Sequence, residues 1–486
     1  MSSGESPYSR VPIGDTMFAG QEENLGKSSS SGGVEESLRD SDYPWVRAIA
    51  CLCFEVRGPE PDPQGWHAGP LPVDLPNGRR ADRAARASYF HARAADSLYG
   101  PLDGSSPARW HRDDGEWPGL AGPLRGIELL RFPRYTSALE THRRDPDQDG
   151  QLIRYMAVIH LSLSANDPLS ELNAAVRLDP LDGRGAARRQ SYADLIGDGF
   201  EIPSKVRRAL SVVMLTWKDN IGSPEDAPVE WTPIMSWLWC AASATPFRDF
   251  CPDPDDPHLL DGIVYLSASW RALVLRDGIA FLGLTPDVQT KGSFFAWGEA
   301  YMRSLYADVA LLAALERDAL DDFADRLARI GNRFEKSVEF RSLVNEVTEF
   351  RNVFWLENVT RHGAANDILR QLHNAHRTPQ VFASVIADLD AFRKQVEARA
   401  MEATFELQVT EERRSRKFDH VASIAAFAFG LPVLIFTALA VPIQGVTSDG
   451  HDVPGWVVVI IALVSIAFGA IAGAVGSRWM TKGRYK

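Results

Sequence analysis

The sequence is poor in cysteine and has no excess of basic residues. Only four of its 486 residues are cysteine, at positions 51, 53, 240 and 251. No spacing among them matches a zinc site, and four cysteines are few for a chain of this length, so disulfides are not expected. Lys and Arg number 52 against 64 Asp and Glu, which gives a formal net charge of −12. This balance excludes a nucleic-acid binder with a basic surface, so no nucleic-acid partner is expected.

Sequence signatures of common enzymes are also missing. There is no Gly-x-Ser-x-Gly elbow, no His-Glu-x-x-His and no Gly-x-Gly-x-x-Gly after a strand. His373 and His376 lie one turn apart just before Pro379, and we interpret them as a solvated helix end. The first forty residues are polar and rich in Ser and Gly, so they do not resemble a secretory signal. We expect residues 1–42 to be a disordered tail and the chain not to be an enzyme.

Charge is absent from two long stretches near the C-terminus. Val421–Gln444 and Gly455–Ser477 contain no Asp, Glu, Lys or Arg over 24 and 23 positions. About 20 apolar residues in a helix suffice to cross a bilayer core of ~30 Å. The sequence therefore predicts a membrane protein with a two-span hairpin at residues 418–477, in contact with membrane lipid.

The flanking charges predict the orientation of this hairpin. Four basic residues stand at positions 413–417 before the first span, and four more lie in the tail at 478–486. The connection Gly445–Pro454 has no Lys or Arg. Basic residues stay on the cytoplasmic side, so both termini should be cytoplasmic and the protein multi-pass in the inner (plasma) membrane. Residues 411–486 carry a net charge of +3 (8 − 5), which leaves −15 on the part that precedes them.

The segment 43–287 has the pattern of a mixed α/β domain. Trp45–Val56, Gly126–Phe132, Tyr155–Ala165 and Ile263–Ser269 are rich in β-branched and aromatic residues and predict strands. Trp270–Leu284 predicts a β-hairpin that turns at Asp277-Gly278. The segment Ser204–Lys218 predicts a helix. Cys51 and Cys53 are two apart in the first strand and should share its buried face.

Residues 294–417 predict a helical stalk region. Ala296–Ile330 and Val338–Val359 have helical apolar spacing, and a third helix should begin near Pro379 and run past Lys417 into the first span. Apolar residues of that helix fall on a heptad-like seam, as in a coiled coil. They are Leu389, Phe392, Val396, Ala403 and Leu407. The seam can pack within the subunit or against another copy. The expected fold class is α+β: a cytoplasmic mixed α/β domain, then the long-helix stalk and two C-terminal transmembrane helices.

Two acidic clusters are weak candidates for a cation site. Asp145, Asp147 and Asp149 reproduce the opening of a calcium loop, but Met156 stands where the closing Glu belongs. A turn rich in Asp and Gly explains this cluster better. Asp253, Asp255 and Asp256 with His258 form the second cluster, in a loop with three prolines. Nothing in the sequence fixes the geometry of that loop.

With two spans per chain, conduction would require a ring of copies. Polar groups that could face such a pore are Asp419 and His420 at the inner mouth, Ser423 and Thr437 in the first span, and Gln444 at the outer mouth. Ser and Thr can instead bond to their own helix, and Asp419 and His420 can lie at headgroup level. Small residues suited to close helix packing are Ala422, Ala426 and Gly430 in the first span and Gly469 and Gly473 in the second.

This organisation resembles the CorA-type magnesium transporters. The resemblance is best over residues 296–486, including FDHVASIAAFAFGLPVLIF with Pro432 in the span and the basic ending SRWMTKGRYK. It implies a homo-oligomer, a pentamer, whose first spans line a central pore, and a divalent cation such as Mg²⁺ as the ion; no resident cofactor is otherwise expected. The Gly-Met-Asn motif of the family is absent, because Val441–Gly445 reads VPIQG. Gln444 is the nearest polar substitute.

Three functions are compatible with these features. The first is a CorA-like cation channel or transporter with a cytoplasmic regulatory domain. The second is a membrane-bound effector, as in some bacterial defence systems, whose N-terminal domain senses a ligand and whose spans open the membrane. The third is a non-conducting, membrane-anchored interaction protein.

Overall fold

The computed structural model describes residues 44–100, 107–113, 124–132, 152–288, 293–330 and 337–443. Backbone contacts divide the chain into two compact units, Met1–Leu389 and Asp390–Lys486. The predicted disordered tail, the Asp145–Asp149 cluster, Gln444 and the second uncharged run lie outside the described residues.

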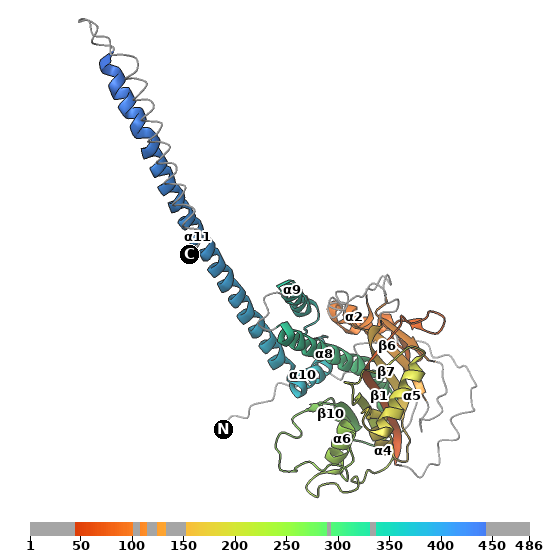
Figure 1. Ribbon diagram of the computed structural model, residues 1–486. Coiled ribbons are helices and arrows are strands. Elements are labelled where there is room, and N and C mark those ends of the chain that lie inside the picture. Colours follow the sequence, from red (N-terminus) through yellow and green to blue (C-terminus); the bar gives the residue numbers. More distant parts are fainter. Residues whose placement is uncertain are drawn as a thin grey trace, which may run out of the picture. The chain divides into compact units, whose positions relative to one another are not determined.

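A mixed β-sheet forms the centre of the first unit (Figure 1). Its nine described strands run in the order β2-β5-β6-β7-β1-β8-β11-β10-β9. They are β1 (Trp45–Gly58), β2 (His67–Ala68), β5 (Arg109–Arg112), β6 (Leu124–Arg131), β7 (Ile153–Ser162), β8 (Leu210–Trp217), β9 (Ile263–Tyr265), β10 (Trp270–Leu275) and β11 (Gly278–Gly283). A separate two-stranded ladder joins β3 (Val73–Asp74) to β4 (Arg80–Ala81).

Strand β1 is buried on both faces because helices cover the sheet on both sides. Cys51 and Cys53 contribute to one apolar core, and Leu52 and Phe54 contribute to the other. The alternation places successive side chains on opposite faces, as strand geometry requires. The prediction that Cys51 and Cys53 share a buried face is confirmed.

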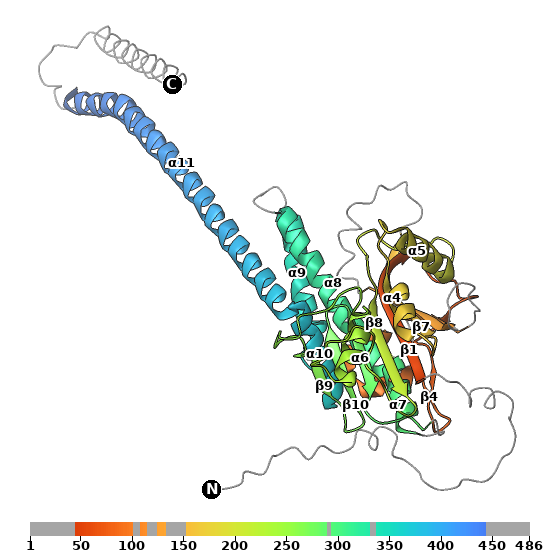
Figure 2. The same ribbon diagram turned by 90° about the horizontal axis from the view of Figure 1, so that it is seen from below.

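The two helical layers come from different parts of the chain (Figure 2). On the Cys51 face the core includes α1 (Arg83–Tyr89), α2 (Ala92–Tyr99), α7 (Phe294–Tyr301), the π-helix η2 (Met302–Tyr306), α8 (Ala307–Ile330) and α10 (Gly363–His376). On the Leu52 face it includes α4 (Pro168–Val176), α5 (Gly183–Ile196) and α6 (Pro233–Ser243). Helix α9 (Ser337–Val353) packs against α8. The compact unit therefore continues past residue 287, through the helices that the sequence assigned to a stalk region, to Leu389.

The predicted strands are present, and one predicted helix is wrong. Ser204–Lys218 contains strand β8, which lies between β1 and β11. Val212 and Met214 enter one core, and Val213 and Leu215 enter the other. In a short apolar run that is buried on both faces, apolar and polar residues do not alternate. Its sequence pattern therefore does not distinguish a strand from a buried helix.

The predicted hairpin is confirmed, but its turn lies one residue earlier. Leu275 pairs with Gly278, so Arg276 and Asp277 are the turn residues. A Cβ atom at Gly278 would lie 2.3 Å from the carbonyl oxygen of Ala242, at the end of α6. Glycine is therefore required here by the close approach of α6 to the sheet rather than by the turn.

Helix α11 (Thr378–Ile443) has 66 residues without a break, as the sequence predicts. Leu389 is buried in the first unit, whereas Leu407, further along the predicted seam, is 67 % exposed. Other large apolar side chains on this part of the helix are exposed as well: Met401, Phe405 and Phe418. The predicted seam is thus packed within the chain at its start and solvent-exposed at Leu407.

Candidate functional site

The first predicted span coincides with the C-terminal part of α11. Asp419, His420, Ser423 and Thr437 are helical residues of α11, as are the small residues Ala422, Ala426 and Gly430. The structure describes the backbone of this part of the helix and not its side chains. Gln444, Gly469 and Gly473 are outside the described residues. The pore and helix-packing assignments therefore stay predictions.

Among the residues that the structure describes, no helix is both long enough and apolar enough to cross a membrane.

The acidic loop at residues 253–258 is folded on itself. The backbone N–H of Asp255 donates to Asp253 Oδ1 (3.0 Å), and that of His258 donates to Asp256 Oδ1 (2.9 Å). The His258 ring is hydrogen-bonded through Nδ1 to Asp261 (2.7 Å). The carboxylates act as turn acceptors, and no group of three His, Cys, Asp or Glu residues suited to a metal ion occurs among the described residues.

The base of α11 is fixed to the end of α10 by a tight connection. Arg377, between the two helices, has φ = 54°, in the left-handed region. The Thr378 hydroxyl donates to the backbone oxygen of His373 (3.2 Å). The first turn of α11 is therefore held by the last turn of α10.

His373 is not at a solvated helix end, and that interpretation is wrong. Its side chain is 8 % exposed, stacks on Trp355 and hydrogen-bonds through Nε2 to Glu316 on α8 (2.5 Å). Glu316 also accepts the backbone N–H of Leu356 (3.3 Å). Burial raises the pKa of Glu316, and its hydrogen bond to His373 opposes that rise. The packing of α10 on α8 buries His373, although its position in the sequence is near the end of a helix.

A second buried acid on α8 joins the helix to the sheet. Asp308 accepts hydrogen bonds from Arg109 on β5 (2.6 Å), from Tyr99 on α2 (2.6 Å) and from Arg86 on α1 (3.3 Å). Both arginines and Asp308 have fully buried side chains. Arg109 also forms an ion pair with Glu128 on β6 (2.7 Å). Two arginines and two carboxylates thus form a charge-balanced cluster, which we call the Asp308 cluster.

The Asp308 cluster continues to Cys51 through His160. Burial lowers the pKa of His160, and its ring is hydrogen-bonded through Nε2 to Glu128 (2.7 Å) while its Nδ1 faces the Cys51 thiol (3.2 Å). Burial alone would raise the pKa of Glu128, but Arg109 and His160 hold it well below its usual range. Burial raises the pKa of Cys51 to about 12. A protonated thiol without solvent access is a poor nucleophile.

Helix α8 carries a third buried ionic link, to α9. Arg326 donates to both carboxylate oxygens of Glu346, at 2.6 and 2.9 Å. Along one helix, Asp308 contacts the sheet side, Glu316 contacts α10 at the base of α11, and Arg326 contacts α9. Buried polar pairs along α8 therefore connect the sheet, α9 and the base of α11, and they resist independent movement of these elements.

The sequence reasoning missed the Asp308 cluster. One signal was available: Asp308 is the single charged residue in the run ADVALLAAL at residues 307–315. A carboxylate in the middle of an apolar helix face needs buried partners. The partners Arg86, Arg109 and Glu128 come from three other elements and could not be chosen without the fold.

Comparison with known proteins gives no relative for this chain: no family model, no curated protein and no solved structure matches it.

Proposed function

We propose that the chain is an oligomeric, CorA-like membrane protein in which the first spans of several copies line a cation pathway and the N-terminal α/β unit regulates it. The observation that carries this proposal is α11. One unbroken helix starts at Thr378, against the buried His373–Glu316 pair, and ends at Ile443, within the uncharged run Val421–Gln444. A regulatory domain joined directly to a span can act on it without a flexible linker.

The charge distribution supports the same assignment. The basic residues at 413–417 and 478–486 favour cytoplasmic placement of both termini, and the −15 of the preceding part then lies on the cytoplasmic unit. Exposed apolar side chains on α11, such as Met401 (72 %) and Phe405 (66 %), support contact with other copies. The proposal assigns no catalytic step to the chain.

A second candidate function is a membrane-bound effector that opens the membrane when its N-terminal unit binds a ligand. The residues VPIQG in place of the Gly-Met-Asn motif favour it, because that change removes the ring that would receive a hydrated cation. An effector needs a pathway but not ion selectivity.

Flux and oligomeric state test both candidates. The purified chain, reconstituted in liposomes, should pass cations, and Asp419→Asn should alter the ion selectivity of that flux. Asp390→Asn on the same helix is the matched control, because Asp390 is exposed and precedes the uncharged run. Its flux should equal that of the unchanged chain.

Selectivity separates the two candidates. Flux that prefers Mg²⁺ or another cation supports a channel, whereas flux of large and small solutes alike supports the effector. A monomer by native mass spectrometry in detergent, with no flux of any solute, would contradict both and leave a non-conducting anchor.

A further inference from the structure

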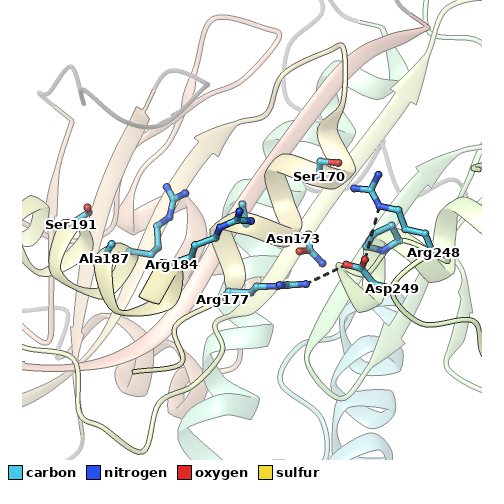
Figure 3. A pocket seen from close by; sticks show the side chains of 11 residues that line it. Ser170, Asn173, Arg177, Arg184, Ala187, Ser191, Arg248 and Asp249 are labelled. Carbon is cyan, nitrogen blue, oxygen red and sulfur yellow. Dashed lines mark hydrogen bonds and ion pairs between the residues drawn. The ribbon is translucent and has the colours of Figure 1, made fainter. Parts of the chain in front are cut away.

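The Leu52 face of the sheet carries a pocket that none of the sequence motifs pointed to. It has a volume of about 630 Å³ and lies between α4, α5 and the loop that follows α6. Four of its lining residues are arginines: Arg177, Arg184, Arg188 and Arg248. Asp249 is the single carboxylate of the lining (Figure 3).

The two helices present these residues with the same spacing. On α4 and its C-cap the lining residues are 170, 173, 174 and 177, and on α5 they are 184, 187, 188 and 191. Steps of three, four and seven place all four residues of each helix on one face. Asp167 and Asp182 cap the two N-termini by accepting the backbone N–H groups of Ser170 and Arg184. Other residues of the two helices, Leu172, Val176, Tyr192 and Ile196, enter the core.

The lining has a net charge of +3 in a chain whose total is −12. Asp249 forms ion pairs with Arg177 (3.2 Å) and, more loosely, with Arg248 (3.9 Å), as Figure 3 shows. Arg188 lies over the Tyr192 ring at 6.0 Å. Within the described residues, no carboxylate pairs with Arg184 or Arg188. Two guanidinium groups therefore face the pocket with their charges uncompensated.

Guanidinium groups select a particular ligand chemistry. Their planar donor forks match phosphate and carboxylate oxygens bidentately, and phosphate offers more acceptors and more charge. The Ser170 and Ser191 hydroxyls add short polar groups to the lining. A volume of about 630 Å³ is typical of sites for drug-sized ligands and is too large for one inorganic phosphate.

The shape of the charge distribution argues against a nucleic acid. Polymer-binding surfaces carry their basic residues along a stripe or an extended face. Here the arginines surround one concavity of a chain that is acidic overall. A small, multiply charged anion fits this arrangement better than a polymer.

We propose that this pocket binds a soluble, phosphorylated small molecule of nucleotide size, with Arg184 and Arg188 as the principal phosphate ligands and Asp249 as a competitor for Arg177. This inference stands independently of the membrane function proposed above. Asp249 forms an ion pair with Arg177, and a bound phosphate would replace that carboxylate.

Calorimetric titration of the full-length chain in detergent tests the proposal. The probes are ATP, sodium tripolyphosphate and adenosine, without metal ions. ATP and tripolyphosphate should bind and adenosine should not, and added salt should weaken binding because the attraction is ionic. Absence of binding by both phosphorylated probes at millimolar concentration would overturn the proposal.

Charge-removing variants locate the binding. Arg184→Gln combined with Arg188→Gln should weaken ATP binding by about tenfold or more. Arg207→Gln is the control, because Arg207 is exposed, lies outside the pocket and pairs only loosely with Asp179 (3.9 Å). Equal loss in the double variant and the control would refute the assignment. Thermal unfolding of each variant shows whether the fold is retained.

Asp249→Asn should change the affinity for ATP in the opposite direction. If Asp249 competes with the ligand, its neutralisation should tighten ATP binding severalfold, whereas Asp194→Asn, at an exposed acid of α5 outside the pocket, should not. Weaker binding in Asp249→Asn would contradict the competition. Vesicles of phosphatidic acid test the other source of phosphate: if they displace ATP more effectively than tripolyphosphate does, the soluble ligand is wrong.

Discussion

His373 and Glu316 form a buried hydrogen bond of 2.5 Å that joins the last turn of α10 to the middle of α8. Helix α10 ends at His376 and α11 begins at Thr378, so this pair lies at the foot of α11. The His373–Glu316 hydrogen bond therefore connects the base of α11, the 66-residue helix, to α8.

Removal of the Glu316 carboxylate should destabilise the first unit. Glu316→Ala leaves His373 and the backbone N–H of Leu356 without an acceptor, at a cost of about 3 kcal/mol. Glu316→Gln keeps an acceptor and should cost less. Thermal unfolding of the full-length chain in detergent measures the difference. Asp325→Ala, an exposed acid on α8, is the control and should leave the midpoint unchanged; equal midpoints for Glu316→Ala and the control would contradict the prediction.

Neutralisation of Asp308 should be more damaging. Asp308→Asn leaves Arg86 and Arg109 with one carboxylate instead of two, in a fully buried site. An uncompensated buried charge costs about 3–5 kcal/mol. The unfolding midpoint should fall further than in Glu316→Ala. The matched control is Asp96→Asn on α2, where the carboxylate is exposed; a loss of the same size there would refute the special role of the Asp308 cluster.

Stability should fall when the solution becomes mildly acidic. Burial, together with Arg317 and Arg276, lowers the pKa of His376 to about 3 from an ordinary value of 6.5. A base with a depressed pKa in the folded state stabilises the fold above its unfolded pKa, and that stability is lost as the pH falls from 6.5 toward 3. At about pH 5 the loss amounts to roughly 2 kcal/mol.

His376→Gln should therefore flatten the decline of the unfolding midpoint between about pH 7 and pH 5. Burial lowers the pKa of His160 as well, with the same sign, so part of the decline should remain. His258→Gln is the control, because His258 is exposed in the loop after α6. An unchanged pH profile in His376→Gln would show that His376 does not titrate as expected.

Thiol reactivity should distinguish the four cysteines. Burial raises the pKa values of Cys51, Cys53 and Cys240, whereas Cys251 is exposed. N-Ethylmaleimide at neutral pH should therefore modify Cys251 first and the other three only after unfolding. Peptide mass spectrometry measures the order, and early labelling of Cys51 would contradict the buried Cys51–His160 contact.

Sequence patterns predicted the long strands β1, β6 and β7, the β10–β11 hairpin and the long helices α8, α9 and α11, but assigned strand β8 to a helix. Strand β1 was recognised from its β-branched and aromatic content, and α11 from its unbroken helical spacing. Strand β8 was assigned to a helix because both of its faces are apolar. The helix pattern of residues 296–330 was correct, although it does not show the π-helical turn at Met302–Tyr306.

The candidate sites were harder to predict than the fold. The Asp308 cluster draws charges from β5, β6, α1 and α8, so it exists only after long-range assembly. The pocket between α4, α5 and the loop after α6 had one signal in the sequence, the repeated spacing of small and basic residues on α4 and α5. The same spacing is found on any solvated helix face. The pocket forms only because α4 and α5 pack beside the loop that contains Arg248.

The position of β1 in the sheet sets the order in which the chain can fold during synthesis. Ile49 pairs with Ser162 on one side and with Met214 on the other, so β1 waits for partners synthesised more than about 100 residues later. At about 5–20 residues per second, its apolar side chains stay uncovered for several seconds. Nascent chains that stop before Trp217 should therefore depend on chaperones, and the sheet is complete before the uncharged C-terminal runs are translated.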